Sequence, residues 1–199
     1  MEEQRKTLGA NFKMLTAVLD GITTLPEFYK SIRSQQEEYH GKGYCAHHDA
    51  IKKYSSDCKS YKELGTHQGA TAAAAVFAEF KNITLVDIDH YKIRPSQKIF
   101  ETHCNLNGIN LNIIQTSSLN KDSVSDVDML LIDSRHTYDH CKKELALHAK
   151  SVKNYIIFHD TAAIPGLKKA VNEFVSANKE WEILEHYEEN VGYSVIGRK

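Results

Sequence analysis

The spacing of apolar residues changes near residue 55. Before that point the apolar side chains follow a helical spacing, first at Leu8, Phe12, Leu15, Val18 and Leu19. Pro26 is placed to open a second helix, and a third is predicted at residues 46–54, after the glycine-containing break at residues 41–43. The first 55 residues therefore predict a helical N-terminal extension.

From Ser60 onward, predicted strands alternate with predicted helices. The strands are predicted at residues 61–64, 83–88, 111–115, 127–132, 155–158, 181–186 and 191–196, and the helices at residues 70–80, 95–107, 138–150 and 167–175. This alternation is typical of an α/β fold whose mostly parallel sheet is covered by helices on both faces. No helix separates the last two strands, so they should form a hairpin that gives the sheet one antiparallel edge strand. The predicted fold is thus a Rossmann-like, doubly wound sheet.

Length and composition agree with this fold. A chain of 199 residues, 41% hydrophobic and 26% charged, suits one compact domain with a short extra segment. We therefore divide the chain into residues 1–55, a helical N-terminal cap, and residues 56–199, the sheet domain. The formal net charge of −1 gives no basic excess, so no nucleic-acid partner is expected.

Membrane and export signals are not evident in the sequence. No apolar run approaches the roughly 18 residues of a membrane span, and the charged N-terminus leads into no apolar segment. The cysteines form no C-x-x-C pair and no zinc-like spacing, which favours free thiols. A cytoplasmic location is therefore expected, because that compartment keeps thiols reduced.

A glycine-containing loop follows the first predicted strand. Ligands of an open parallel sheet bind at the carboxyl ends of its strands, and Gly65 and Gly69 allow a sharp turn and close approach of the backbone there. Twenty-odd residues further on, Asp87 or Asp89 ends the second strand, where a carboxylate can accept the ribose hydroxyls of a nucleoside. At the end of the third strand, small polar residues at Ser117 and Ser118 can hydrogen-bond an adenine ring.

Acidic and imidazole groups follow the next two strands. Asp133 comes directly after the apolar strand at residues 127–132, and His159 and Asp160 follow the strand at residues 155–158. These three residues could converge on a divalent cation, with the carboxylates favouring Mg²⁺ or Ca²⁺ and the imidazole admitting Mn²⁺ or Zn²⁺. The alternative is a hydrogen-bonded polar cluster without metal, in which Arg135 or a histidine supplies the positive charge.

These motifs together resemble those of the class I S-adenosylmethionine-dependent methyltransferases. The resemblance is strongest to the branch that contains small-molecule O-methyltransferases of antibiotic tailoring and the cephalosporin-hydroxylase-like proteins. The residues that carry it are 63–69, 87–89, 131–138, 158–161, 165–170 and 191–193.

The resemblance implies an enzyme that methylates a hydroxyl group of a small molecule, such as a sugar or a natural product. It implies that S-adenosylmethionine is held by Glu63, Gly65, Thr66, His67, Gly69, Asp87, Ser117, Ser118 and Asp133. The implied metal ligands are Asp133, His159 and Asp160, and the implied catalytic residues are Asp133, Arg135 and His136. His136 is the candidate general base, because an unperturbed histidine titrates near pH 6.5; a plain loop histidine is the alternative.

Two other functions stay open. A non-catalytic nucleoside-binding module would keep the glycine loop and Asp87 but would not need Asp133, His159 and Asp160. A dehydrogenase on the same scaffold would need a loop that accommodates a pyrophosphate, yet His67 stands at the central glycine position of G-x-G-x-x-G. This favours a ligand without phosphates.

The N-terminal segment is predicted to cover the strand ends. Its cluster of His40, Tyr44, His47 and His48 suggests a wall of the substrate site. The alternative is a surface appendage or a dimer contact, so a homodimer stays open.

Overall fold

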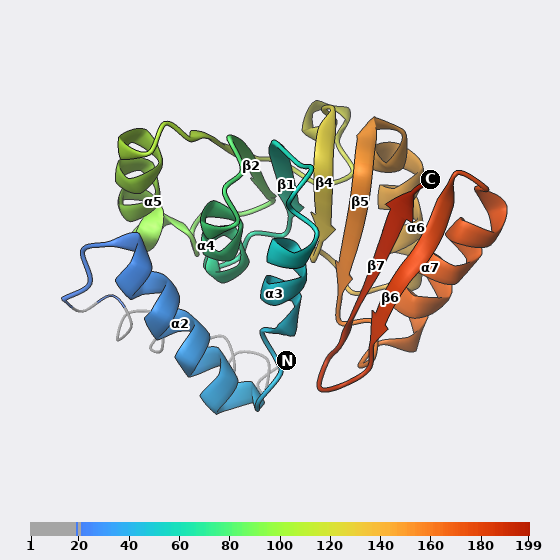
Figure 1. Cartoon of the computed structure of the whole chain (residues 1–199), viewed down its shortest axis with the longest axis horizontal. Coiled ribbons are helices and arrows are strands. Elements are labelled where there is room, and N and C mark those ends of the chain that lie inside the picture. The colour runs from blue at the N-terminus through green and yellow to red at the C-terminus, as the bar shows by residue number, and fades with distance from the viewer. Residues whose placement is uncertain (1–18, 20) are drawn as a thin grey trace.

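The computed structural model describes residue 19 and residues 21–199, so the predicted first helix lies largely outside the described residues. Seven strands form one sheet in the order β3-β2-β1-β4-β5-β7-β6 (Figure 1). The strands are β1 (Ser60–Leu64), β2 (Asn82–Asp87), β3 (Asn110–Gln115), β4 (Val127–Ile132), β5 (Val152–His159), β6 (Trp181–Tyr187) and β7 (Tyr193–Arg198).

The predicted Rossmann-like sheet is confirmed. Strands β1 to β5 pair in parallel, and β7 runs antiparallel to both β5 and β6. The predicted hairpin is therefore present, with β7 as the reversed strand and β6 at the outer edge. The strand order reverses between β1 and β4, which places their carboxyl ends side by side at the point where ligands bind in such sheets.

Helices cover both faces of the sheet (Figure 1). They are α2 (Leu25–His40), α3 (Ala46–Lys53), α4 (Ala70–Phe77), α5 (Arg94–Leu106), α6 (Tyr138–His148) and α7 (Pro165–Ala177), with short 3-10 turns at Lys121–Ser123 and Ala149–Ser151. Helix α2 begins with a capping box in which Thr24 and Glu27 bond each other's backbone N–H groups. Pro26 lies in its first turn, as predicted.

The strands alternate their side chains between two cores. Along β4, Met129 and Leu131 pack against α2 to α5, whereas Leu130 and Ile132 pack against α6 and α7. All four side chains are buried, which explains why this strand is almost wholly apolar. Asp133 directly follows this buried strand, so its backbone is firmly positioned.

Helix α4 is shorter than predicted. It ends at Phe77 rather than at residue 80, because Glu79 adopts a left-handed backbone conformation with φ 71°. That turn sends Phe80 into the core, where its ring centroid lies 5.3 Å from that of Tyr61. The buried alanines of α4 let the helix approach the sheet closely.

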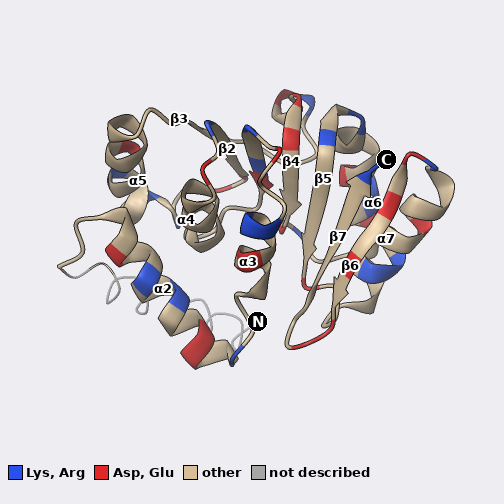
Figure 2. Ribbon diagram, viewed as in Figure 1, with Lys and Arg blue, Asp and Glu red and all other residues tan. Residues whose placement is uncertain are grey.

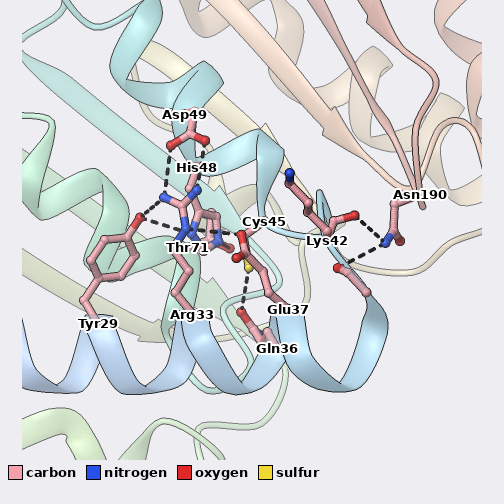
Figure 3. Close-up of polar contacts among 11 residues, drawn as sticks. Tyr29, Arg33, Gln36, Glu37, Lys42, Cys45, His48, Asp49, Thr71 and Asn190 are labelled. Carbon is pink, nitrogen blue, oxygen red and sulfur yellow. Dashed lines mark hydrogen bonds and ion pairs between the residues drawn. The ribbon is translucent and has the colours of Figure 1, made fainter.

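The N-terminal helices share the core of the sheet domain. Phe28 of α2 and Ile51 of α3 are fully buried in the same cluster as strand residues such as Leu131. Arg33 of α2 forms two hydrogen bonds to the Asp49 carboxylate of α3, at 3.0 and 2.9 Å, which holds the two helices together (Figure 3).

Acidic and basic residues are mixed over the elements, as along α2 and α7 (Figure 2). Among the residues that the structure describes, no helix combines the length and the apolarity needed to cross a bilayer.

Candidate active site

A cavity of about 280 Å³ lies at the carboxyl ends of β1, β4 and β5. It brings together residues from three separate predicted motifs, namely Glu63, Gly65, Thr66, His67, Asp133, His136, His159 and Asp160. Its volume is near the lower end of the range for ligand pockets, about 300 Å³. The switch point of the sheet therefore carries a small, mostly polar site.

Gly65 lets the β1 loop touch the end of β4. Its φ of 94° favours glycine, and a Cβ atom there would lie 2.1 Å from the carbonyl oxygen of Asp133. No side chain fits into that space. The close contact of the two strand ends, which defines the floor of the cavity, thus depends on this glycine.

Asp87 fixes the glycine loop from the neighbouring strand. Its carboxylate accepts hydrogen bonds from the backbone N–H of His67, at 2.9 Å, and from that of Asp89, at 3.0 Å. His67 itself has a left-handed φ of 49°, a conformation that costs a non-glycine residue energy. The bond from Asp87 helps to hold the loop in this shape.

Asp133 and Asp160 are bridged by His136. The imidazole Nε2 lies 2.9 Å from Asp133 Oδ1, and Nδ1 lies 2.8 Å from Asp160 Oδ2. Hydrogen bonds to Asp133 and then to Asp160 raise the pKa of His136 to about 10. Both nitrogens must carry protons to donate, so His136 is a cation between two carboxylates.

His159, at the end of β5, contacts the same two carboxylates. Its Nδ1 lies 3.2 Å from Asp133 Oδ1 and 3.4 Å from Asp160 Oδ1. Burial lowers the pKa of His159, but the charges of Asp133 and Asp160 more than offset this and leave the pKa raised. For Asp133, the neighbouring histidines outweigh the effect of burial and hold the pKa well below its usual range.

Two buried polar atoms of the cavity residues lack a partner. Thr66 Oγ1 and His159 Nε2 are both enclosed and have no hydrogen bond within the part of the chain that the structure describes. Buried polar groups are nearly always satisfied, so such atoms point to a missing ligand or water.

Glu63 lies fully buried at the base of the cavity. Burial raises the pKa of its carboxyl well above the ordinary value, and the Tyr61 hydroxyl donates to Oε2 at 2.8 Å. The raised pKa favours the neutral carboxyl, which can donate a hydrogen bond as well as accept one.

The N-terminal segment supplies a second wall. Gln36, His40 and Tyr44 line the cavity opposite the strand ends. The His40 and Tyr44 rings stack with centroids 4.2 Å apart, and Tyr44 meets His159 edge-on at 5.7 Å. Behind this wall, the ring centroids of His47 and His159 lie 4.0 Å apart and those of His47 and His48 4.4 Å apart. Both His47 and His48 lie within hydrogen-bond distance of the Thr71 hydroxyl, and His48 also contacts the Tyr29 hydroxyl.

Five predicted site residues lie outside the cavity lining, as far as the described residues show. They are Gly69, Asp87, Ser117, Ser118 and Arg135. Gly69, with φ 86°, turns the chain into α4 where a Cβ would meet Phe100 at 3.0 Å. Ser118 bonds His140, Ser117 accepts from the Leu119 N–H, and Arg135 is exposed.

Four further residues line the cavity and were not among the predicted site residues, namely Gln36, Gln68, Thr71 and Ser134. Gln68 and Ser134 stand inside the quoted motifs, so their position beside Gly65 and Asp133 was a usable signal. Gln36 stands in a charged stretch of α2 and gave no such signal.

A larger groove of about 740 Å³ lies elsewhere, between α6, α7 and the start of β6. It is at the amino end of the parallel strands, since Arg198 there donates to Val152 O at the start of β5. The acids and histidines described above do not line it, so the smaller cavity is the candidate active site.

Comparisons with known proteins agree with this fold. No sequence family matches the chain, and no curated protein sequence matches it. Among solved structures, a Staphylococcus aureus protein classed as a caffeoyl-CoA O-methyltransferase is similar with a TM-score of 0.65 at 15% identity, over 86% of this chain and 92% of the other.

Two further structures are similar over most of their length. The Podospora anserina methyltransferase PaMTH1, bound to S-adenosylhomocysteine, gives a TM-score of 0.64 at 14% identity, over 96% of both chains. The O-methyltransferase TomG from Streptomyces achromogenes, involved in tomaymycin synthesis and bound to S-adenosylmethionine, gives 0.61 at 8% identity, over 82% of this chain and 86% of TomG. The chain therefore has the fold of the class I S-adenosylmethionine-dependent methyltransferases, as the resemblance implied.

Proposed function

We propose that this protein is an S-adenosylmethionine-dependent methyltransferase that methylates a hydroxyl group of a small molecule. The observation that carries the proposal is the cavity in which the β1 glycine loop faces Asp133, His136 and Asp160. A cofactor loop and a set of proton-accepting groups share one small space there. The proteins of similar fold bind S-adenosylhomocysteine or S-adenosylmethionine, which supports the choice of cofactor.

The residues present fit the cofactor. Gly65 keeps the loop free of a side chain where it meets β4, and Thr66 offers an enclosed hydroxyl without a partner. Asp87 already orients the loop and retains lone pairs for a ribose hydroxyl. We assign the cofactor to the loop at residues 63–69, together with Asp87, Ser117 and Ser118.

The cofactor, when bound, supplies an activated methyl group on a sulfonium ion. The chain's own task is to orient the acceptor hydroxyl and to take its proton. Two carboxylates and two imidazoles meet at the cavity, so a proton released there can pass to a carboxylate, or to His136 once a cation has displaced it from the two acids. Arg135, exposed beside this cluster, is assigned to the acceptor side rather than to proton transfer.

A divalent cation is the second part of the proposal. Asp133, His159 and Asp160 each offer one ligand atom, and these atoms lie within 4.8 Å of one another. The two carboxylates favour Mg²⁺ or Ca²⁺, and the imidazole admits Mn²⁺ or Zn²⁺. His136 now supplies the positive charge between the carboxylates, so a cation would have to displace it from one of them.

Binding is tested by calorimetry with S-adenosylhomocysteine, S-adenosylmethionine and NAD, each with and without Mg²⁺. We expect the first two to bind and NAD not to bind. Binding of NAD alone would instead support the dehydrogenase alternative. Binding of S-adenosylhomocysteine without turnover on a broad panel of hydroxylated compounds would favour the non-catalytic module.

The cation is tested on the active enzyme. Activity in excess chelator should fall and should return on titration with Mg²⁺ or Mn²⁺. Full activity in chelator, with no metal retained by elemental analysis, would leave Asp133, His159 and Asp160 as a hydrogen-bonded cluster held by His136.

A further inference from the structure

The turn between β6 and β7 contacts both walls of the cavity. Asn190 in this turn donates from its side-chain amide to the carbonyl oxygen of His40 at 3.0 Å, and its Nδ2 lies 3.3 Å from those of Gly41 and Lys42. Figure 3 shows Asn190 beside Lys42. The three carbonyls belong to the corner between α2 and α3. That corner carries His40 and Tyr44 to the cavity.

The Asn190 side chain is held at both ends. Its Oδ1 accepts from the backbone N–H of Val191 at 2.8 Å, which fixes the amide with its donors toward the corner. The backbone at Asn190 is left-handed, with φ 57°, a conformation that asparagine tolerates better than most residues. Both the donor group and the backbone shape therefore suit asparagine at this position.

The next residue reaches the opposite wall. The carbonyl oxygen of Val191 accepts from the N–H groups of Ala162 and Ala163, both at 3.0 Å. These residues directly follow Asp160 and Thr161 at the end of β5. Gly192 packs so tightly that a Cβ would lie 2.4 Å from Ala162 Cβ. Two adjacent residues thus join the His40–Tyr44 wall to the Asp160 wall.

Besides the Asn190 bonds, the corner contacts the sheet domain through Tyr44, whose ring lies edge-on to that of His159 at 5.7 Å. Helix α3 is tied further along, where Lys53 and Tyr54 donate to Glu185 of β6 at 2.7 and 3.0 Å. Gly41 and Gly43 bend the corner itself, with φ values of 95° and 87°. Because glycine permits many backbone conformations, these two residues do not fix the corner by themselves. The Asn190 bonds therefore have a large effect on where the corner lies.

We propose that Asn190 is a positioning residue, which sets the separation of the two cavity walls and thereby the access of small molecules to His159. It acts through the His40–Lys42 backbone and touches neither cofactor nor acceptor. The inference deepens the proposed function, since the wall it positions is the acceptor side of the proposed site.

The test compares Asn190→Gly and Asn190→Asp with Asn107→Gly. Glycine keeps the left-handed backbone and removes the amide, whereas aspartate keeps the shape and presents a carboxylate to three carbonyls. Asn107 is the matched control, because its Nδ2 also donates to a backbone carbonyl, that of His103 at 2.8 Å, at the end of α5.

Two rates report on the position of the wall that carries His40 and Tyr44. Amide hydrogen exchange is followed at Gly41, Tyr44 and Ala46, whose N–H groups bond within and beside the corner. Carbethoxylation of His159, only 4% exposed, is followed by peptide mass spectrometry. In both Asn190 variants we expect each rate to rise about tenfold, the effect of losing a hydrogen bond of ordinary strength. Asn107→Gly should leave both rates unchanged.

The affinity for S-adenosylhomocysteine and the stability in urea distinguish a local change at the corner from a loss of cofactor binding or of the whole fold. The affinity should stay within about twofold, since the glycine loop is held by Asp87 and not by the turn. Unchanged rates in a folded Asn190→Gly protein would overturn the proposal, and so would a rise spread evenly over the whole chain. Failure of the unmodified protein to bind S-adenosylhomocysteine would refute the proposed function, while the two rates would still decide the role of Asn190.

Discussion

Replacement of His136 by glutamine tests whether an imidazolium holds the acidic pair together. Glutamine keeps a polar side chain but cannot carry charge. In the unmodified protein both ring nitrogens face carboxylates, at 2.9 and 2.8 Å, and the pKa of His136 is raised to about 10. Without that cation, the repulsion between Asp133 and Asp160 would be offset by His159 alone of the two histidines that now contact both acids.

The direction in which the stability changes with pH follows from the raised pKa of His136. A histidine whose pKa rises on folding contributes stability that is fully present below pH 6.5 and is lost as pH rises toward 10. The rise from 6.5 to about 10 corresponds to an unscreened limit of about 5 kcal/mol. The side chain is 36% exposed, so solvent screening reduces this limit. We expect a net effect of about 1–2 kcal/mol.

The assay is urea unfolding at intervals from pH 6 to pH 9.5, with chelator present to exclude cations. The free energy of unfolding of the unmodified protein should fall across this range by about 1–2 kcal/mol more than that of His136→Gln. His103→Gln serves as control, because the His103 ring packs against Phe77 rather than between acids. Parallel pH curves for the unmodified protein and His136→Gln would refute the imidazolium bridge.

Two further predictions concern the cofactor side. Gly65→Ala, whose Cβ would lie 2.1 Å from the Asp133 carbonyl at φ 94°, should lower the free energy of unfolding by about 3 kcal/mol in urea titration. Gly108→Ala, at φ 64° with open space around it, should cost only about 1 kcal/mol, and equal costs would contradict the reasoning. Asp87→Ala should weaken S-adenosylhomocysteine binding by about 1–3 kcal/mol in calorimetry. Asp128→Ala, which also removes a carboxylate that accepts from backbone N–H groups but at the far end of β4, should leave that affinity unchanged; a folded Asp87→Ala protein with full affinity would remove this acid from the site.

The fold was largely predictable because the strands of a covered parallel sheet have a strong sequence signature. Residues 127–132 are almost all apolar, and the structure buries them between two helical layers. Element ends were harder to place, since they depend on single residues such as Glu79, whose left-handed backbone ends α4 early. Propensity alone favours continuing that alanine-rich helix, and the burial of Phe80 overrides it.

The site was predictable where residues follow strands, and in part where they come from the N-terminal segment, since His40 and Tyr44 of the predicted wall line the cavity. Asp133 and Asp160 could be placed together because neighbouring parallel strands end at one edge. The bridging position of His136 depends on how the loop after β4 folds back, which the pattern of residues does not encode. Gln36 faces the cavity from α2, and Asn190 reaches the α2–α3 corner across about 150 positions. Contacts of such sequence separation depend on how the N-terminal helices pack on the sheet domain.

The protonated imidazole of His136 and a metal ion would compete for the same position between Asp133 and Asp160. His136 satisfies one oxygen of Asp133 and one of Asp160, while His159 Nδ1 lies near the same Asp133 oxygen. A cation that uses both carboxylates removes the reason for the raised pKa of His136, so the histidine would lose its proton at neutral pH. A displaced, neutral imidazole at the mouth of the cavity is a competent base, whereas the bridging imidazolium is not. Under the proposed function, the presence of a metal would therefore decide which residue takes the acceptor's proton: His136 with a cation bound, and a carboxylate without one.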